Sequence, residues 1–130
     1  RINIHQVGNK PFDIQGIEVI PLDISHHFLH VLGFRIADLT YITDCRTIPG
    51  HTLSKILNTK ILVINALRKT PHISHLSLGQ ALKIIEKVRP EKAYITHLSH
   101  KMGKHEQISH ELPENVELAY DGLKIVTRDE

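Results

Sequence analysis

The helix predicted from Ser77 to Arg89, between two short apolar runs, constrains the fold more than any other stretch. Ser77 and Gln80 have the spacing of a capping box, and Pro90 ends the helix. The flanking runs, 61–64 and 92–96, have the length and composition of strands, and the first is apolar enough to be buried on both faces. A strand, a helix and a second strand in this order are typical of an α/β fold. The apolar stripe of the helix consists of Leu78, Ala81, Leu82, Ile85 and Val88.

Further elements are predicted on both sides of this unit. On its amino side we expect a strand over 16–24 that breaks at Pro21, a hairpin over 31–45 that turns near Ala37-Asp38, and a helix over 51–58. On its carboxyl side we expect a short helix over 104–111 and a hairpin over 116–126, which turns on Asp121-Gly122 in the type I′ conformation. This order predicts a single α/β domain over 1–130, with a mixed sheet and flanking helices.

The composition is that of a globular domain with an unusual amount of histidine. Of the 130 residues, 41% are hydrophobic, and no apolar run approaches the roughly 18 residues of a membrane span. The one cysteine, Cys45, excludes an internal disulfide, so we expect a cytoplasmic protein. The net charge of +2, with basic and acidic residues interspersed, gives no indication of a nucleic-acid partner. The 11 histidines favour metal or acid–base chemistry.

Polar side chains follow three of the predicted strands. "PLDISHH" places His26 at the end of one strand, "TYITDC" places Asp44 at the end of another, and "KAYITHLSH" places His97 at the end of a third. In α/β folds, chemistry collects at strand ends, because a rigid sheet holds the side chains there beside adaptable loops. Two histidines and a carboxylate that converge in this way suit zinc or manganese.

Each of these residues also has an ordinary structural explanation. A loop histidine such as His26 is often only solvated, and an aspartate at a strand end, such as Asp44, often caps a helix or forms a turn. Cys45 follows Asp44 and would point the opposite way in an extended chain, which indicates a small buried hydrophobic residue. Spacing alone leaves these alternatives open.

At these residues the sequence resembles the metallo-β-lactamase superfamily, and within it the PhnP-like metal-dependent hydrolases. The likeness covers nearly the whole chain, through "PFDIQGIEVIPLDISHH", "LGFRIADLTYITDC", "HLSLGQAL", "AYITHLSH" and "ELAYDGL". The resemblance implies two divalent metal ions, zinc or manganese. His26 would bind one, Asp44 would bridge both, and His97 would bind the second. It also implies that His75 is the general acid of a phosphodiesterase. His100 and Lys101, which follow closely, are candidates to contact the substrate phosphate, with simple solvation as the alternative.

One departure from the family pattern is large. The His-x-His-x-Asp-His motif, which supplies most metal ligands in this superfamily, does not occur in the chain, and the chain begins with Arg1. We therefore expect residues 1–130 to be the C-terminal half of a four-layer αββα sandwich. The full-length protein is expected to hydrolyse a small phosphodiester with a metal-activated water. This segment alone is expected to be inactive, to bind metal weakly or not at all, and to form a homodimer or an element-swapped oligomer through its uncovered face.

Two other functions remain open. The first is a ribonuclease Z-like nuclease, which shares the fold and a similar last-histidine motif, although the chain has no stretch rich in lysine or arginine. The second is a non-catalytic binding module on the same scaffold. The joint presence of His26, Asp44, His75 and His97 argues against that module.

Overall fold

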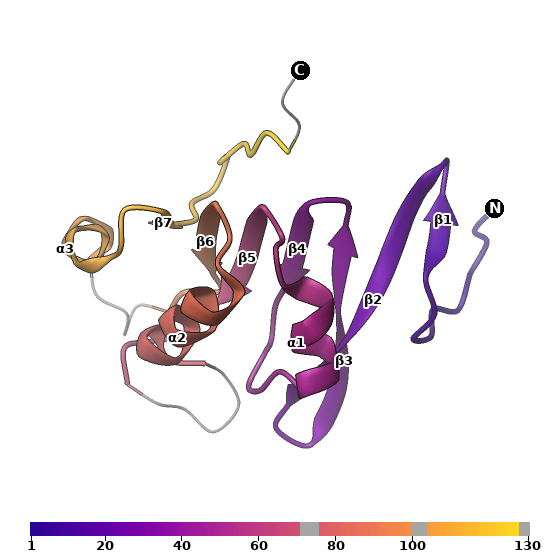
Figure 1. Ribbon diagram of the computed structural model, residues 1–130, viewed down its shortest axis with the longest axis horizontal. Helices are drawn as coiled ribbons and strands as arrows, with labels where there is room; N and C mark the ends of the chain where they lie inside the picture. The colour runs from indigo at the N-terminus through magenta and orange to yellow at the C-terminus, as the bar shows by residue number, and fades with distance from the viewer. Residues whose placement is uncertain (71–75, 100–103, 128–130) are drawn as a thin grey trace.

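The protein folds around one mixed sheet of seven strands, whose order in space follows their order in the chain (Figure 1). The computed structural model describes residues 1–70, 76–99 and 104–127. The strands are β1 (Phe12–Ile14), β2 (Ile17–His26), β3 (Leu29–Ile36), β4 (Leu39–Ile42), β5 (Ile61–Asn65), β6 (Lys92–Thr96) and β7 (Val116–Leu118). The first four strands pair in antiparallel fashion, and β4 to β7 pair in parallel. The predicted α/β class and mixed sheet are thus confirmed.

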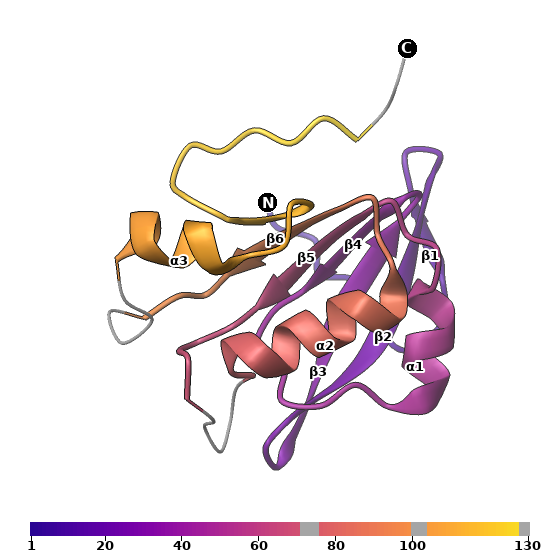
Figure 2. The same ribbon diagram turned by 60° about the vertical axis from the view of Figure 1, so that its left-hand side comes forward.

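Helices connect the parallel strands and cover one face of the sheet. Figures 1 and 2 show α1 (Gly50–Ile56) and α2 (Leu78–Val88) on the same side of β3 to β6, with α3 (His105–Glu111) beside β7 at the edge. The capping box predicted for α2 is present: the Gln80 amide donates to the Ser77 hydroxyl, and the Ser77 amide donates to Gln80. Arg89 ends the helix in the left-handed conformation, and Pro90 follows it.

The two faces of the sheet differ in burial. The face toward α1 and α2 holds the core, to which β5 contributes the fully buried Leu62 and Ile64. The strand registers place Phe34, Tyr41, Val63 and Tyr94 in one row on the opposite face. We call this row the uncovered row. The name refers to helices only, because exposure along the row is uneven: Tyr41 is 47% exposed, whereas Val63 is 6% exposed.

The predicted break at Pro21 is wrong, because β2 runs through it and pairs Pro21 with Phe34. β1 pairs with residues 17 to 19 of β2, so among the described residues the other side of β2 has no partner strand at Pro21. Proline is tolerated at such an edge, because its missing amide hydrogen costs no hydrogen bond between strands when it faces the open side.

The predicted type I′ hairpin at Asp121-Gly122 is also wrong. Only Gly122 has a positive φ there, 88°, and the Leu123 amide donates to the Tyr120 carbonyl, which together make a type II turn. A type II turn does not match the twist of a hairpin, and no strand follows β7 up to residue 127. The type I′ turn lies instead between β1 and β2, where Gln15 and Gly16 both have positive φ. The sequence-based prediction missed β1 altogether.

Within the described residues, none of the helices has the length and apolar character needed to cross a lipid bilayer.

Candidate metal centre

The sheet topology brings the three predicted strand ends to one edge. β4 and β6 are parallel through β5, so Asp44 and His97, which follow them, lie at the same end of the sheet. β2 is antiparallel to β3, which is antiparallel to β4, so β2 also runs in this direction and ends with His26 at this edge. This is the edge at which α/β sheets bind their ligands.

At this edge the three residues contact one another through Asp44. The His97 Nε2 atom lies 3.4 Å from the Asp44 Oδ1 atom. The His26 Nδ1 atom lies 2.9 Å from the backbone carbonyl oxygen of Asp44. A carbonyl oxygen only accepts, so His26 donates from Nδ1, and the lone pair of the neutral ring is then on Nε2. Metal-binding histidines are commonly held by such a bond from the other ring nitrogen.

Two of these residues adopt a backbone conformation that is uncommon outside glycine. The φ angles of Asp44 and His97 are 56° and 61°, in the left-handed region. Such residues tend to cluster at functional sites, where the surrounding structure holds the strain. Their side chains are 48% and 41% exposed, so both reach solvent at the edge of the sheet.

Backbone hydrogen bonds fix the segments that carry these side chains. Ser25, next to His26, exchanges hydrogen bonds with Arg46 and Thr47, beyond Asp44. The Ala66 amide donates to the carbonyl of Thr96, the residue before His97, over 3.0 Å. Independently of the side chains, these bonds tie the His26 segment to the Asp44 segment and the end of β5 to the His97 segment.

The buried side chain of Asn65 adds two more bonds. Its Oδ1 accepts from the Cys45 amide over 2.9 Å, and its Nδ2 donates to the Cys45 carbonyl over 3.0 Å. The sequence-based prediction did not select Asn65. The available signal was a polar residue closing an apolar strand, "ILVIN", at the edge that holds the candidate ligands.

Cys45 is a structural residue, as predicted from its alternation with Asp44. It is completely buried in the core, and this burial raises the pKa of its thiol to about 12, although nearby Arg46 acts in the opposite direction. The thiol stays protonated at neutral pH and is unsuited to be a nucleophile or a metal ligand.

The donor atoms that meet here suit a divalent cation. Two ligands of one tetrahedral zinc ion, each about 2.0–2.1 Å from the metal, lie about 3.3 Å apart. The separation of Asp44 Oδ1 and His97 Nε2, 3.4 Å, is close to this value. Over residues 1–70, 76–99 and 104–127, however, no group of three or more His, Cys, Asp or Glu side chains is arranged to hold a metal. His26 reaches the backbone of Asp44 and not its carboxylate, so the described part of the site is a pair of candidate ligands, Asp44 and His97, with a third candidate beside it.

The remaining predicted site residues, His75, His100 and Lys101, lie outside the described residues. His97 also lines a small pocket, together with Thr96, Leu98, Ala119, Tyr120 and Asp121. It offers space for part of a substrate beside the candidate metal ligands.

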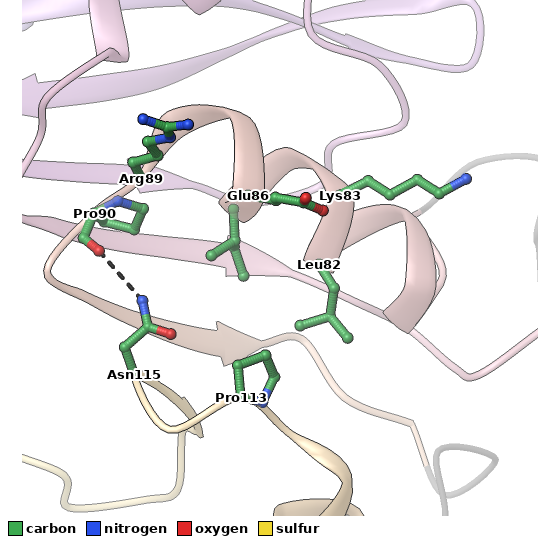
Figure 3. A pocket seen from close by; sticks show the side chains of 8 residues that line it. Leu82, Lys83, Glu86, Arg89, Pro90, Pro113 and Asn115 are labelled. Atoms are coloured by element: carbon green, nitrogen blue, oxygen red, sulfur yellow. Dashed lines mark hydrogen bonds between the residues drawn. The ribbon is translucent and has the colours of Figure 1, made fainter.

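A second pocket lies between α2 and the segment before β7, as Figure 3 shows, with Asn115 Nδ2 donating to the Pro90 carbonyl. Arg89 and Pro90 precede β6, so this pocket is at the amino end of the strand that carries His97 at its carboxyl end. It is therefore separate from the candidate metal centre.

Comparison with known proteins supports the relationship that the site suggests. An octanoyltransferase from Porphyromonas gingivalis (strain ATCC BAA-308 / W83) is 31% identical over 119 residues, which are 91% of this chain and 24% of that protein. A crystal structure described as a new diphosphatase from the PhnP family superposes with a TM-score of 0.94 at 32% identity, over 97% of this chain and 49% of that chain. Zinc-bound PqqB from Methylobacterium extorquens, with a TM-score of 0.69 and 13% identity over 88% of this chain and 52% of that one, shares the fold.

The chain spans about half the length of the diphosphatase and about a quarter of the octanoyltransferase. Residues 1–98 match the family described as the beta-lactamase superfamily domain (Lactamase_B_2). Since this match covers most of the 130 residues, the chain belongs to that superfamily.

Proposed function

We propose that the complete protein is a metal-dependent hydrolase that cleaves a P–O bond in a small phosphodiester or a diester of diphosphate. The observation that supports this most directly is the 3.4 Å approach of the Asp44 carboxylate to His97 Nε2, beside His26, at the ligand-binding edge of the sheet. The similarity to a PhnP-family diphosphatase adds the substrate class, since that structure matches 97% of this chain at 32% identity.

In this proposal the three residues hold two divalent cations, zinc or manganese. Asp44, with its two carboxylate oxygens, would hold both cations, and His26 and His97 would each hold one through an imidazole nitrogen. When bound, the two cations supply an activated water and neutralise the charge of the phosphoryl oxygens. The chain contributes only part of the ligand set, and the rest comes from a preceding half of the sandwich, so residues 1–130 alone bind metal weakly and do not turn over substrate.

His75 is the proposed general acid, which protonates the leaving oxygen. It directly precedes Leu76, whose amide donates to the carbonyl of Cys45, next to the bridging Asp44. His100 and Lys101 are proposed to contact the substrate phosphate. The pocket at Tyr120 and Asp121, beside His97, is the proposed place for the rest of the substrate.

The test is hydrolysis by the complete protein of bis(4-nitrophenyl) phosphate and of a dinucleoside 5′,5′-diphosphate, with zinc or manganese added. We expect activity on at least one substrate, abolished by a chelator and restored by the metal. Asp44→Asn should lower kcat/KM by about 100-fold or more, since metal stabilisation of the transition state is worth several kcal/mol. Asp38→Asn is the matched control, because Asp38 lies in the β3–β4 turn at the other end of β4. No hydrolysis of either substrate by the metal-loaded protein would refute the proposal.

The alternative functions give different results. A ribonuclease Z-like nuclease would cleave a tRNA precursor faster than either small substrate. A non-catalytic module would be indicated if Asp44→Ala and His97→Ala left all functions of the protein unchanged. The name of the octanoyltransferase describes a protein of which this chain matches only 24%. Cys45, buried and with a thiol pKa of about 12, offers no thiolate for acyl transfer.

For the isolated segment we propose self-association through a second copy, as a homodimer or by exchange of an element. The uncovered row, with Tyr41 47% exposed, is the surface that a second copy would bury. The proposal includes a cytoplasmic location, which the single, buried and reduced cysteine supports.

A further inference from the structure

Asn65 is a completely buried polar side chain at the end of β5, the strand between the two that carry Asp44 and His97. A buried amide costs free energy unless its hydrogen bonds are made. The side-chain amide of Asn65 makes two hydrogen bonds, both with Cys45. Its oxygen accepts from the backbone N–H of Cys45, and its NH₂ group donates to the backbone carbonyl of Cys45. Asn65 therefore acts on the backbone immediately after Asp44.

The peptide group between Asp44 and Cys45 connects Asn65 to the candidate ligands. Its N–H donates to Asn65 Oδ1 over 2.9 Å. Its C=O bond lies in the same plane and points in the opposite direction, and the carbonyl oxygen is 2.9 Å from His26 Nδ1. Because a peptide group is planar, fixing the N–H direction also fixes the C=O direction. Asn65 thereby sets the acceptor that holds the His26 ring.

The Asp44–Cys45 peptide group also directly follows the strained backbone of Asp44. Asp44 has a φ of 56°, and its carboxylate faces His97 across 3.4 Å. Such a conformation persists only when surrounding contacts hold it. The two bonds from Asn65 are buried, so water does not compete for them.

We propose that Asn65 is a positioning residue of the metal centre. It orients the Asp44–Cys45 peptide, so that His26 is held as the tautomer with its lone pair on Nε2 and the Asp44 carboxylate faces His97. This inference deepens the proposed function and, for its effect on metal affinity, rests on it. The orientation of His26 is a property of the chain itself and is measurable without metal.

The experiment compares Asn65→Leu with the wild type in the complete protein. Leucine has a similar volume and makes neither bond to Cys45. Thr40→Val is the matched control, because it removes the buried bond from Thr40 to Thr59 on the strand that leads to Asp44, away from the site. Asn65→Asp retains an acceptor for the Cys45 amide and provides a second variant if Asn65→Leu does not fold.

Two quantities are measured. The first is zinc affinity, by competition with a chromophoric chelator. We expect Asn65→Leu to weaken it by about 10- to 100-fold, the usual effect of losing a residue that orients metal ligands, with Thr40→Val unchanged and Asn65→Asp in between. The second is the His26 tautomer in the metal-free protein, by ¹H–¹⁵N NMR of the ring, assigned with a His26→Gln variant. We expect protonated Nδ1 in the wild type and in Thr40→Val, and a mixture of tautomers in Asn65→Leu.

The outcomes separate the two proposals. If the wild type binds no zinc, the proposed function fails, and the NMR comparison still decides the role of Asn65. If the wild type binds zinc, and Asn65→Leu keeps both its affinity and the Nδ1-protonated ring, the positioning role is refuted. A loss of affinity shared equally by Thr40→Val would also refute it, because the effect would then be one of general stability.

Discussion

At the scale of single residues, the candidate site combines ligand chemistry with backbone strain. Asp44 and His97 both adopt the left-handed conformation, with φ angles of 56° and 61°. For residues other than glycine this conformation costs roughly 1–2 kcal/mol, and asparagine tolerates it better than most. The contact between His97 Nε2 and Asp44 Oδ1, 3.4 Å apart and half exposed to solvent, by itself offsets little of this cost. Positive φ at residues other than glycine recurs at functional sites, so the backbone of Asp44 and His97 is consistent with the metal-binding roles proposed for them.

This strain predicts a trade-off at His97. His97→Asn should raise the free energy of unfolding of the metal-free protein, by up to about 1 kcal/mol, because asparagine is less strained there. It should also weaken metal binding, because an imidazole ligand is lost. Chemical denaturation and zinc titration measure the two effects.

His27 provides the matched control for this variant. It is exposed in the β2–β3 turn, with a φ of 54°, and is not a predicted ligand. His27→Asn should give a similar gain in stability with unchanged zinc affinity. If His97→Asn bound zinc as the wild type does, His97 would not be a ligand.

The buried thiol of Cys45 predicts a pH dependence. Its pKa is raised by burial from the ordinary value of 9.0 to about 12, so above pH 9 the unfolded chain loses this proton while the folded chain keeps it. The contribution of this group to stability is complete below pH 9 and falls as the pH rises from 9 to 12. Denaturation of the wild type and of Cys45→Ala at pH 8, 9 and 10 should show a steeper decline for the wild type. Equal slopes would contradict the burial of a protonated thiol.

The candidate ligands could be predicted from the sequence, but Asn65, the residue proposed to position them, could not. His26, Asp44 and His97 each follow an apolar run, and parallel strand ends share an edge, so their meeting followed from local pattern and topology. Asn65 bonds to Cys45, 20 positions away, and no local rule pairs an asparagine amide with a distant peptide group. The metal-binding roles of the three residues stay predictions.

At the scale of secondary structure, the sequence predicted an element correctly where the residues of that element alone determine its bounds. α2 has its capping box, its apolar stripe and its proline stop, and it begins and ends as predicted. The errors lie at turns and edges. β2 continues through Pro21, beyond the three residues that pair with β1, and the Asp121-Gly122 turn adopts type II instead of the hairpin type. Both depend on which segment lies alongside, and the residue pattern does not contain that information.

The cap of α2 gives a prediction at this scale. Ser77→Ala removes the bond from the Gln80 amide and should destabilise the protein by about 1 kcal/mol. Thermal or urea denaturation measures this loss. Ser54→Ala is the control, since Ser54 is exposed and its hydroxyl, within the described part of the chain, donates to a carbonyl of its own helix, that of His51. Its effect should be much smaller, and equal effects would contradict the capping role.

At the scale of the whole molecule, one face of the sheet is covered by helices and the other is not. The uncovered row predicts concentration-dependent self-association of the isolated segment. Tyr41→Lys, which places a charge on this row, should weaken the association by about tenfold or more, as expected for an aromatic residue within an interface. Leu57→Lys is the control, because Leu57 is similarly exposed, at 42%, but follows α1 on the helical side. Analytical ultracentrifugation that shows a monomer at all concentrations would contradict this prediction.

The proposed function requires that His26, Asp44 and His97 share one metal centre at the carboxyl edge of the sheet. Anomalous diffraction at the zinc or manganese edge, from crystals of the complete protein grown with that metal, tests it most directly. We expect peaks about 2.0–2.3 Å from Asp44 Oδ1 and His97 Nε2, with His26 Nε2 bound to a cation in the same cluster. Peaks bound to other residues, or none at saturating metal with this edge of the sheet well ordered, would contradict it.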